Sequence, residues 1–300
     1  MSSFGKILVA TDLSNFSVRV VERAAMIAAQ VHASLWLVHV MDAGAIRAFE
    51  ALTGAWAAAR KSAAVKRAQS QLGENAERLR ARYHVPVHAE VIAGHPHAII
   101  ARLAESHDVA LTVMGAHSNE TLRHMMLGTT GERMLKAIRT PILVVRNKAI
   151  EPYVGVLATM DFSDAAAAAL SLVVKIVPNA HLAVLHVIDT HFDGLIGLFG
   201  ARAEDLAEFW TEARVDALAK IDSLIARLAP PPAAVERDVE SGKPADVILH
   251  RARGAGVDLL AIGRHGAMRA LDVLVGGVAR QVVNRSDCDV LVSGIIGAGD

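Results

Sequence analysis

Small residues recur at one spacing in both halves of the chain. They are Gly115, Ser118, Gly128, Thr129 and Thr130 in the first half, and Gly263, Gly266, Gly276 and Gly277 in the second. In each half, an apolar run ends at the first of these residues, and a helical pattern follows the last. A loop that leaves a parallel strand and a loop that enters a helix both present free backbone N–H groups. Glycine lets such a backbone approach a ligand closely, and phosphate suits this geometry, with Thr129 or Thr130 able to add a hydroxyl.

A carboxylate follows the first apolar run of each half. Asp12 lies in KILVATDLS (6–14), and Asp161 lies in VGVLATMDFS (154–163). If the first and fourth strands of each half are neighbours, each carboxylate faces the glycine loop and can accept hydrogen bonds from a ribose hydroxyl or a base amino group. This arrangement predicts a mononucleotide pocket. The alternative is that the glycines are only turns and caps and that the carboxylates are helix-start residues favoured by the helix dipole.

The whole chain is organised as a duplication. Five segments of the first half recur in the same order in the second, at an offset that stays within 147 to 149 residues. We therefore predict two domains, residues 1–148 and 149–300, which the length of 300 residues also favours. In each half, short apolar strands alternate with helical segments, of which 43–84 is a long amphipathic one. The pattern is typical of an α/β, Rossmann-like fold with a doubly wound parallel sheet of five strands and about four helices. Ser14 and Ser163 are expected to cap the first helix of each half.

Composition excludes several classes of partner. Lys and Arg total 31, as do Asp and Glu, and this balance argues against nucleic-acid binding. Cys288 is the only cysteine, so we expect a buried thiol and a cytoplasmic protein without an intramolecular disulfide. Residues 1–12 lack the pattern of an export signal. Residues 24–41 contain no charged residue, but polar residues interrupt them, which predicts a helix, a turn and a buried strand and no membrane association.

The sequence gives little support to other nucleotide-binding motifs, to metal binding or to catalysis. The chain has neither a G-x4-G-K-[S/T] phosphate loop nor a G-x-G-x-x-G fingerprint after the first strand. Histidines crowd residues 84–97, but no carboxylate or cysteine completes a metal ligand set, so we expect no metal site. His39 and His186 recur at strand ends and are expected to be structural, whereas His117 and His265 lie in the glycine loops and either bind a phosphate or stabilise the turn. No catalytic residue is predicted, because no nucleophile has a base beside it.

The frame G-x2-G-x9-G-[S/T], together with D-x-S after the first strand, resembles the universal stress protein family in its tandem form. The resemblance implies a sheet order of 3-2-1-4-5, and binding of ATP or AMP in some members and not in others, with or without Mg²⁺. It implies nucleotide contacts at Asp12, Gly115, Gly128 and Thr129 in the first half, and at Asp161, Gly263, Gly266 and Gly276 in the second. The first half departs from the frame at Ser118, and the second departs at Gly277. We expect unequal sites, with the first half favoured because it retains the hydroxyl.

The leading hypothesis is a stress-response protein that binds an adenine nucleotide and acts as a sensor or regulatory binding module towards an unidentified protein partner. One alternative is a scaffold or interaction protein with vestigial sites, and a weaker one is a slow ATPase or self-phosphorylating enzyme. The resemblance also implies that strands 141–146 and 289–294 pair across a pseudo-two-fold axis, as an intramolecular mimic of a dimer. Whether two chains form a homodimer is left open.

Overall fold

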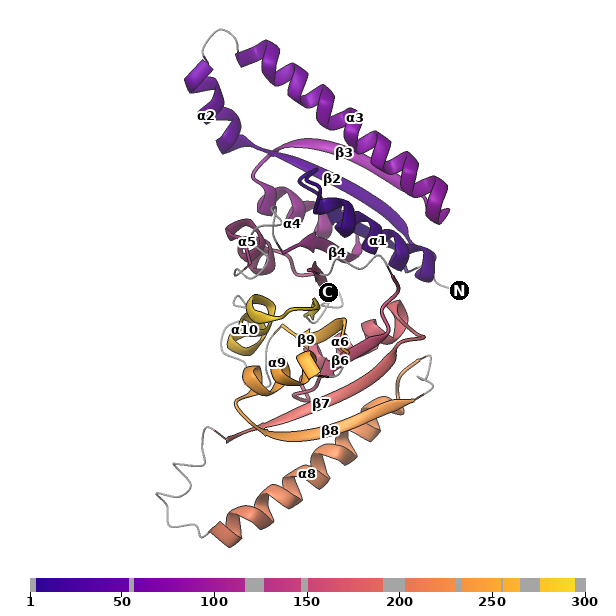
Figure 1. The fold of residues 1–300 in the computed structure, drawn as a ribbon, viewed down its shortest axis with the longest axis vertical. Helices are drawn as coiled ribbons and strands as arrows, with labels where there is room; N and C mark the ends of the chain where they lie inside the picture. Colours follow the sequence, from indigo (N-terminus) through magenta and orange to yellow (C-terminus); the bar gives the residue numbers. More distant parts are fainter. Residues whose placement is uncertain are drawn as a thin grey trace. The chain divides into compact units, whose positions relative to one another are not determined.

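The computed structural model describes residues 4–53, 57–116, 127–146, 151–190, 203–229, 234–254, 256–264 and 276–294. The chain divides into two compact units, Met1–Pro152 and Tyr153–Asp300, here called the first and the second unit. Each unit is an α/β domain with a parallel sheet and helices packed against it (Figure 1). No helix in the described ranges is long and apolar enough to span a membrane.

The first unit contains one parallel sheet in the order β3-β2-β1-β4-β5. Its elements are, in chain order, β1 (Lys6–Ala10), α1 (Ser17–Val31), β2 (Ser34–Asp42), α2 (Ala43–Thr53), α3 (Ala57–Tyr83), β3 (Val87–Gly94), α4 (Pro96–Ser106), β4 (Val109–Gly115), α5 (Thr129–Ala137) and β5 (Ile142–Val145). The strand order reverses between β1 and β4, because β2 and β3 extend the sheet on one side and β4 and β5 on the other. This reversal brings the carboxyl end of β1 beside that of β4, where Ala10 pairs with Met114.

The second unit repeats this topology in the order β8-β7-β6-β9-β10. Its elements are β6 (Gly155–Thr159), α6 (Asp164–Ile176), β7 (His181–Asp189), α8 (Ala203–Ile225), β8 (Val235–Gly242), α9 (Pro244–Gly254), β9 (Leu259–Gly263), α10 (Gly277–Arg285) and β10 (Asp289–Ser293). Numbered within each unit, both sheets have the order 3-2-1-4-5, which confirms the predicted fold class and the predicted neighbourhood of the first and fourth strands.

The strands of each core are the uninterrupted apolar runs of the sequence. Ile7, Leu8 and Val9 of β1 are fully buried, as are Leu260 and Ala261 of β9. Burial on both faces explains why these runs do not alternate with polar residues. The charge-free segment 24–41 is indeed a helix end, a turn and a strand: α1 ends at Val31, His32 takes a left-handed φ of 54°, and β2 begins at Ser34.

Within the described residues, the predicted amphipathic helical region at 43–84 contains two helices, α2 and α3. The described part of the first unit therefore has five helices, against about four predicted. Figure 1 shows α3 running along the outside of β3 and β2. A buried carboxylate joins α3 to α1: Glu22, which is 1% exposed, accepts hydrogen bonds from Arg78 and from the Tyr83 hydroxyl, and Arg82 lies 3.5 Å from it. Burial and this acidic neighbour raise the pKa of Tyr83 to about 12.

Candidate functional site

A cavity of about 320 Å³ lies at the carboxyl ends of β1 and β4 in the first unit. Six elements line it: the ends of β1, β2 and β4, and the starts of α1, α4 and α5. The predicted site residues among its lining are Asp12, Gly115, Gly128, Thr129 and Thr130. The structure therefore brings together, around one cavity, residues that are more than 100 positions apart in the chain. Ser118, the sixth predicted residue of this half, falls outside the described residues.

The start of α5 presents unsatisfied N–H groups to this cavity. Gly128 precedes the helix with φ −59° and ψ 155°, and no side chain caps it. The Gly128 N–H donates to the Ala116 carbonyl at 3.3 Å, and the Glu132 N–H donates to the Gly128 carbonyl at 3.0 Å. Between them, the N–H groups of residues 129–131 have no acceptor among the described residues. Helix N-termini of this kind attract anions.

Gly128 is not required by its own torsions or by its protein neighbours. Its φ and ψ are open to any residue, and an added Cβ would meet no heavy atom closer than the Ala116 carbonyl oxygen at 3.9 Å. Among the described residues, none fills the space in front of it. Gly115 is different, because a Cβ there would lie 3.0 Å from the Phe16 ring and 3.2 Å from the Val20 side chain. Gly115 thus makes room for α1, which is a packing role.

Asp12 forms a tight local turn at the end of β1. Its Oδ1 accepts hydrogen bonds from the Ser14 N–H at 3.0 Å and from the Ser14 hydroxyl at 2.7 Å. The intervening Leu13 has a left-handed φ of 62°, a conformation that is costly for a branched side chain. The same side chain keeps Oδ2 for another partner, and Asp12 is exposed at the cavity.

The second unit repeats this turn. Asp161 Oδ1 accepts from the Ser163 N–H at 3.0 Å and from its hydroxyl at 2.5 Å, and Phe162 has the same φ of 62°. Ser163 caps α6 as predicted, because its hydroxyl accepts from the Ala166 N–H at 3.2 Å. The prediction for Ser14 is wrong in detail: α1 begins only at Ser17, with Phe16 at its N-cap position. The Ser14 hydroxyl instead caps the turn that precedes the helix.

The glycine positions of the second unit are packed differently. A Cβ on Gly263 would lie 2.8 Å from the Ala166 backbone nitrogen, so the start of α6 rests directly on the end of β9. Gly276 precedes α10 with φ −56° and ψ 152°, and its N–H donates to the Arg264 carbonyl at 2.8 Å, as Gly128 does in the first unit. Gly277 is the first residue of α10, with no atom within 4 Å of an added Cβ. Gly266 falls outside the described residues.

Arg264 distinguishes the second unit and was missed by the sequence analysis. It occupies the position of Ala116 in the repeat, is only 7% exposed, and burial lowers its pKa to about 10. The difference is visible when LTVMGAHS is aligned with LLAIGRHG, because the first half has the methyl group of Ala116 where the second has the guanidinium of Arg264. No motif in the sequence marks the apolar side chains that line the first cavity, which are Val38, Val40, Pro96, Ile100, Met114 and Met134.

The remaining chemical candidates are structural. His39 Nδ1 lies 2.9 Å from the Thr11 carbonyl oxygen and His186 Nδ1 lies 2.6 Å from that of Met160, which supports the predicted role at the strand ends. Cys288 is buried, and burial raises the pKa of its thiol to about 11. Within the described ranges, no group of three or more His, Cys, Asp or Glu side chains could hold a metal ion. His117 and His265 fall outside these ranges.

The sequence frame, the strand order and the repeated turn can now be compared with known proteins. The model of the universal stress protein family matches residues 3–146 and again residues 153–293. The chain belongs to the universal stress protein family. Because the family model matches twice, the tandem form suggested by the sequence frame is confirmed.

Individual relatives agree with this assignment. The universal stress protein MJ0531 of Methanocaldococcus jannaschii is 27% identical over 143 residues, which are 48% of this chain and 82% of that protein. The universal stress protein YxiE of Bacillus subtilis is 28% identical over 143 residues, 45% of this chain and 95% of that protein. A crystal structure of a universal stress protein from Archaeoglobus fulgidus has a TM-score of 0.69 at 19% identity, covering 98% of this chain and 99% of that one. It shows the shared fold.

Proposed function

We propose that the first unit binds an adenine nucleotide, ATP or AMP, in the cavity between β1 and β4, and that its occupancy makes this universal stress protein a sensor or regulatory binding module. The observation that carries the proposal is the row of N–H groups at residues 129–131, beside a cavity whose lining also includes several apolar side chains. The phosphates would accept hydrogen bonds from this row, and the Thr129 and Thr130 hydroxyls are placed to add to it.

Other parts of the lining suit a nucleoside. Val38, Val40, Pro96 and Ile100 offer apolar side chains to a base, and the open oxygen of Asp12 can accept from a ribose hydroxyl. A volume of about 320 Å³ is at the lower end of the range of small-molecule sites, roughly 300–1,000 Å³. The cavity therefore fits a mononucleotide, with the outer phosphates over the exposed start of α5.

Charge in this cavity is sparse. Asp12 is the only charged residue among the described lining, so neutral N–H groups and the helix dipole would hold the phosphates. Mg²⁺, if it accompanies ATP, would be held chiefly by the phosphates, because no acidic cluster awaits it in the described ranges. We expect any hydrolysis to be slow and incidental, since none of the described lining residues is a histidine, lysine or arginine that could assist it.

The second unit is proposed to bind nucleotide more weakly or not at all. Gly277 lacks the hydroxyl of Thr129, and the backbone of α6 approaches the end of β9 so closely that a Cβ on Gly263 would lie 2.8 Å from the Ala166 nitrogen. Buried Arg264 replaces the small Ala116 at the same place in the repeat. These differences favour a single occupied site per chain.

A scaffold with vestigial sites is the rival function, and it has its own support. The Asp12 and Asp161 turns satisfy one carboxylate oxygen internally, and Gly115 and Gly263 are both explained by helix packing. Under this hypothesis, the protein acts only through an interaction surface. For either function we propose a cytoplasmic location, on the ground of the single buried thiol. An intramolecular pseudo-dimer, a homodimer and an unidentified protein partner stay predictions.

Native mass spectrometry of the freshly purified chain, with any released ligand identified and counted, tests the proposal. One adenine nucleotide per chain is the expected result, and its loss in a Gly128→Val variant but not in a Gly277→Val variant would assign it to the first unit. A chain that is empty and stays unshifted with millimolar ATP or AMP would leave the scaffold as the function.

A further inference from the structure

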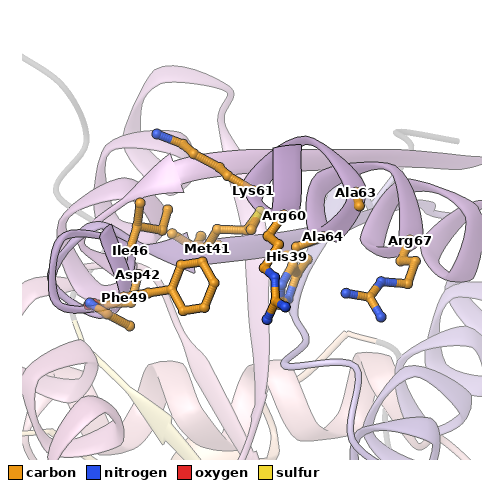
Figure 2. A pocket seen from close by; sticks show the side chains of 12 residues that line it. His39, Met41, Asp42, Ile46, Phe49, Arg60, Lys61, Ala63, Ala64 and Arg67 are labelled. Atoms are coloured by element: carbon orange, nitrogen blue, oxygen red, sulfur yellow. The ribbon is translucent and has the colours of Figure 1, made fainter. Parts of the chain in front are cut away.

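A second and larger cavity lies in the first unit, away from the motifs discussed so far. It has a volume of about 580 Å³ and opens between the end of β2, helix α2 and the first turns of α3 (Figure 2). Val40 is the only residue that it shares with the lining of the nucleotide cavity. The two cavities are therefore neighbours with different walls, and nothing in the glycine frame or in the D-x-S turn accounts for the second one.

One end of this cavity is apolar. Figure 2 shows the side chains of Met41, Ile46 and Phe49 on the same side of the cavity, near the end of β2 and α2. Phe49 is 37% exposed, which is unusual for a phenylalanine on a helix that packs against a sheet and another helix. An apolar ligand body placed here would remove this surface from water, and that burial would be favourable.

The other end is cationic. Arg60 lies beside His39 in Figure 2, and Arg67 lies on the same side, whereas Lys61 extends in a different direction and pairs with Glu50 at 2.9 Å. Neither Arg60 nor Arg67 has an ion-pair partner among the described residues. The Arg side chains are exposed enough to reorient towards a ligand.

The helix start adds to this positive potential. Arg60 is in the first turn of α3, which contains no acidic residue, so a cation lies at the positive end of the helix dipole. The helix dipole repels the charge of Arg60 in the free protein, and a bound anion would offset this repulsion. The one carboxylate of the lining, Asp42, is engaged elsewhere: its Oδ1 accepts from the Ala45 N–H at 2.8 Å, and this bond holds the pKa of Asp42 below its usual value.

We propose that this cavity binds a small organic acid with an apolar body. Its carboxylate or sulfonate would pair with Arg60 and Arg67, and its hydrocarbon or aromatic body would lie against Met41, Ile46 and Phe49. Charge complementarity selects an anion, and the separation of the two ends selects an amphipathic one. The proposal does not depend on nucleotide binding, because the two cavities present different groups.

The probe is laurate, titrated calorimetrically into the full chain below its micellar concentration and in the presence of saturating ATP. We expect one laurate per chain, no detectable binding of acetate, which lacks the body, and none of dodecyltrimethylammonium, which has the opposite charge. Across octanoate, decanoate and laurate, each methylene that enters the cavity should tighten binding by up to about fourfold. Equal binding of the cationic detergent would overturn the proposal.

A matched pair of double variants locates the site. Arg60→Gln with Arg67→Gln should weaken laurate binding about tenfold, because both charge-assisted hydrogen bonds are lost. Arg47→Gln with Lys66→Gln removes the same charge from α2 and α3, at exposed positions outside the cavity, and should leave laurate binding unchanged. Circular dichroism confirms that both variants are folded.

Two results would contradict the assignment. If the two double variants weaken laurate binding equally, the effect comes from net charge and not from this cavity. If the chain binds vesicles that contain an anionic phospholipid but not monomeric laurate, the surface recognises a membrane and not a free organic acid.

Discussion

Alanine substitutions at three glycines separate a packing role from a ligand role. At Gly263, the new Cβ would lie 2.8 Å from the Ala166 nitrogen and 3.1 Å from the Ala165 carbonyl carbon, which are backbone atoms of α6. A side chain can relieve such a contact by changing its rotamer, but a helix backbone cannot. We therefore expect Gly263→Ala to lower the free energy of unfolding of the second unit by about 1–3 kcal/mol.

The two helix-start glycines should behave differently. At Gly277, the Cβ meets nothing within 4 Å, so Gly277→Ala should stabilise the second unit by about 0.5–1 kcal/mol through helix propensity and the unfolded-state entropy. At Gly128, the torsions suit alanine and the nearest atom is 3.9 Å away, so stability should change by less than about 0.5 kcal/mol. The Gly128 methyl group would, however, occupy the path of the phosphate and weaken nucleotide binding by about tenfold or more.

Urea denaturation followed by circular dichroism gives the stabilities, and calorimetric titration with ATP and AMP gives the affinities. Gly277→Ala serves as the control for binding, and Gly128→Ala as the control for stability. The reasoning is refuted if Gly263→Ala is as stable as the wild type, or if Gly128→Ala binds nucleotide normally. The second outcome alone would favour the scaffold and leave the packing argument intact.

Three further predictions follow from the described contacts. Glu22→Ala should destabilise the first unit by about 3 kcal/mol, measured by urea denaturation, because the paired groups on α3 lose their buried partner; a change below 1 kcal/mol would contradict the proposed link between α1 and α3. Since burial raises the pKa of Cys288 from 9.0 to about 11, the stability that the neutral thiol contributes is complete below pH 9 and is lost as the pH rises towards 11. Unfolding free energies at pH 8 and pH 10 should therefore differ more in the wild type than in Cys288→Ala, and equal differences would count against a protected thiol. Thr129→Val should weaken nucleotide binding at most about tenfold, since the hydroxyl is exposed, and calorimetry that shows no change would remove this hydroxyl from the site.

Much of the architecture was readable from the sequence because it depends on local patterns. Apolar runs that do not alternate predicted strands buried on both faces, and the constant offset between the halves predicted a duplicated fold. The residues 24–41 were assigned correctly because a change from alanine-rich to β-branched and aromatic sequence marks the change from helix to strand. At 43–84 the amphipathic pattern predicted helical structure, but it did not indicate that the described residues there form two helices, α2 and α3.

Within the candidate site, the sequence determined which residues recur and in which chemical types, from Asp12 and Gly128 in one half to Asp161 and Gly276 in the other. Only the tertiary structure showed which of these positions pack against a helix and which line a cavity. Gly115 and Gly263 belong to the same sequence frame as Gly128 and Gly276, yet helix packing accounts for both, because the neighbours of a Cβ come from distant segments of the chain. The same holds for the cavity beside α2. Arg60 and Phe49 belong to no recognisable motif, and only the packing of two helices and a strand end brings them into the lining of one cavity.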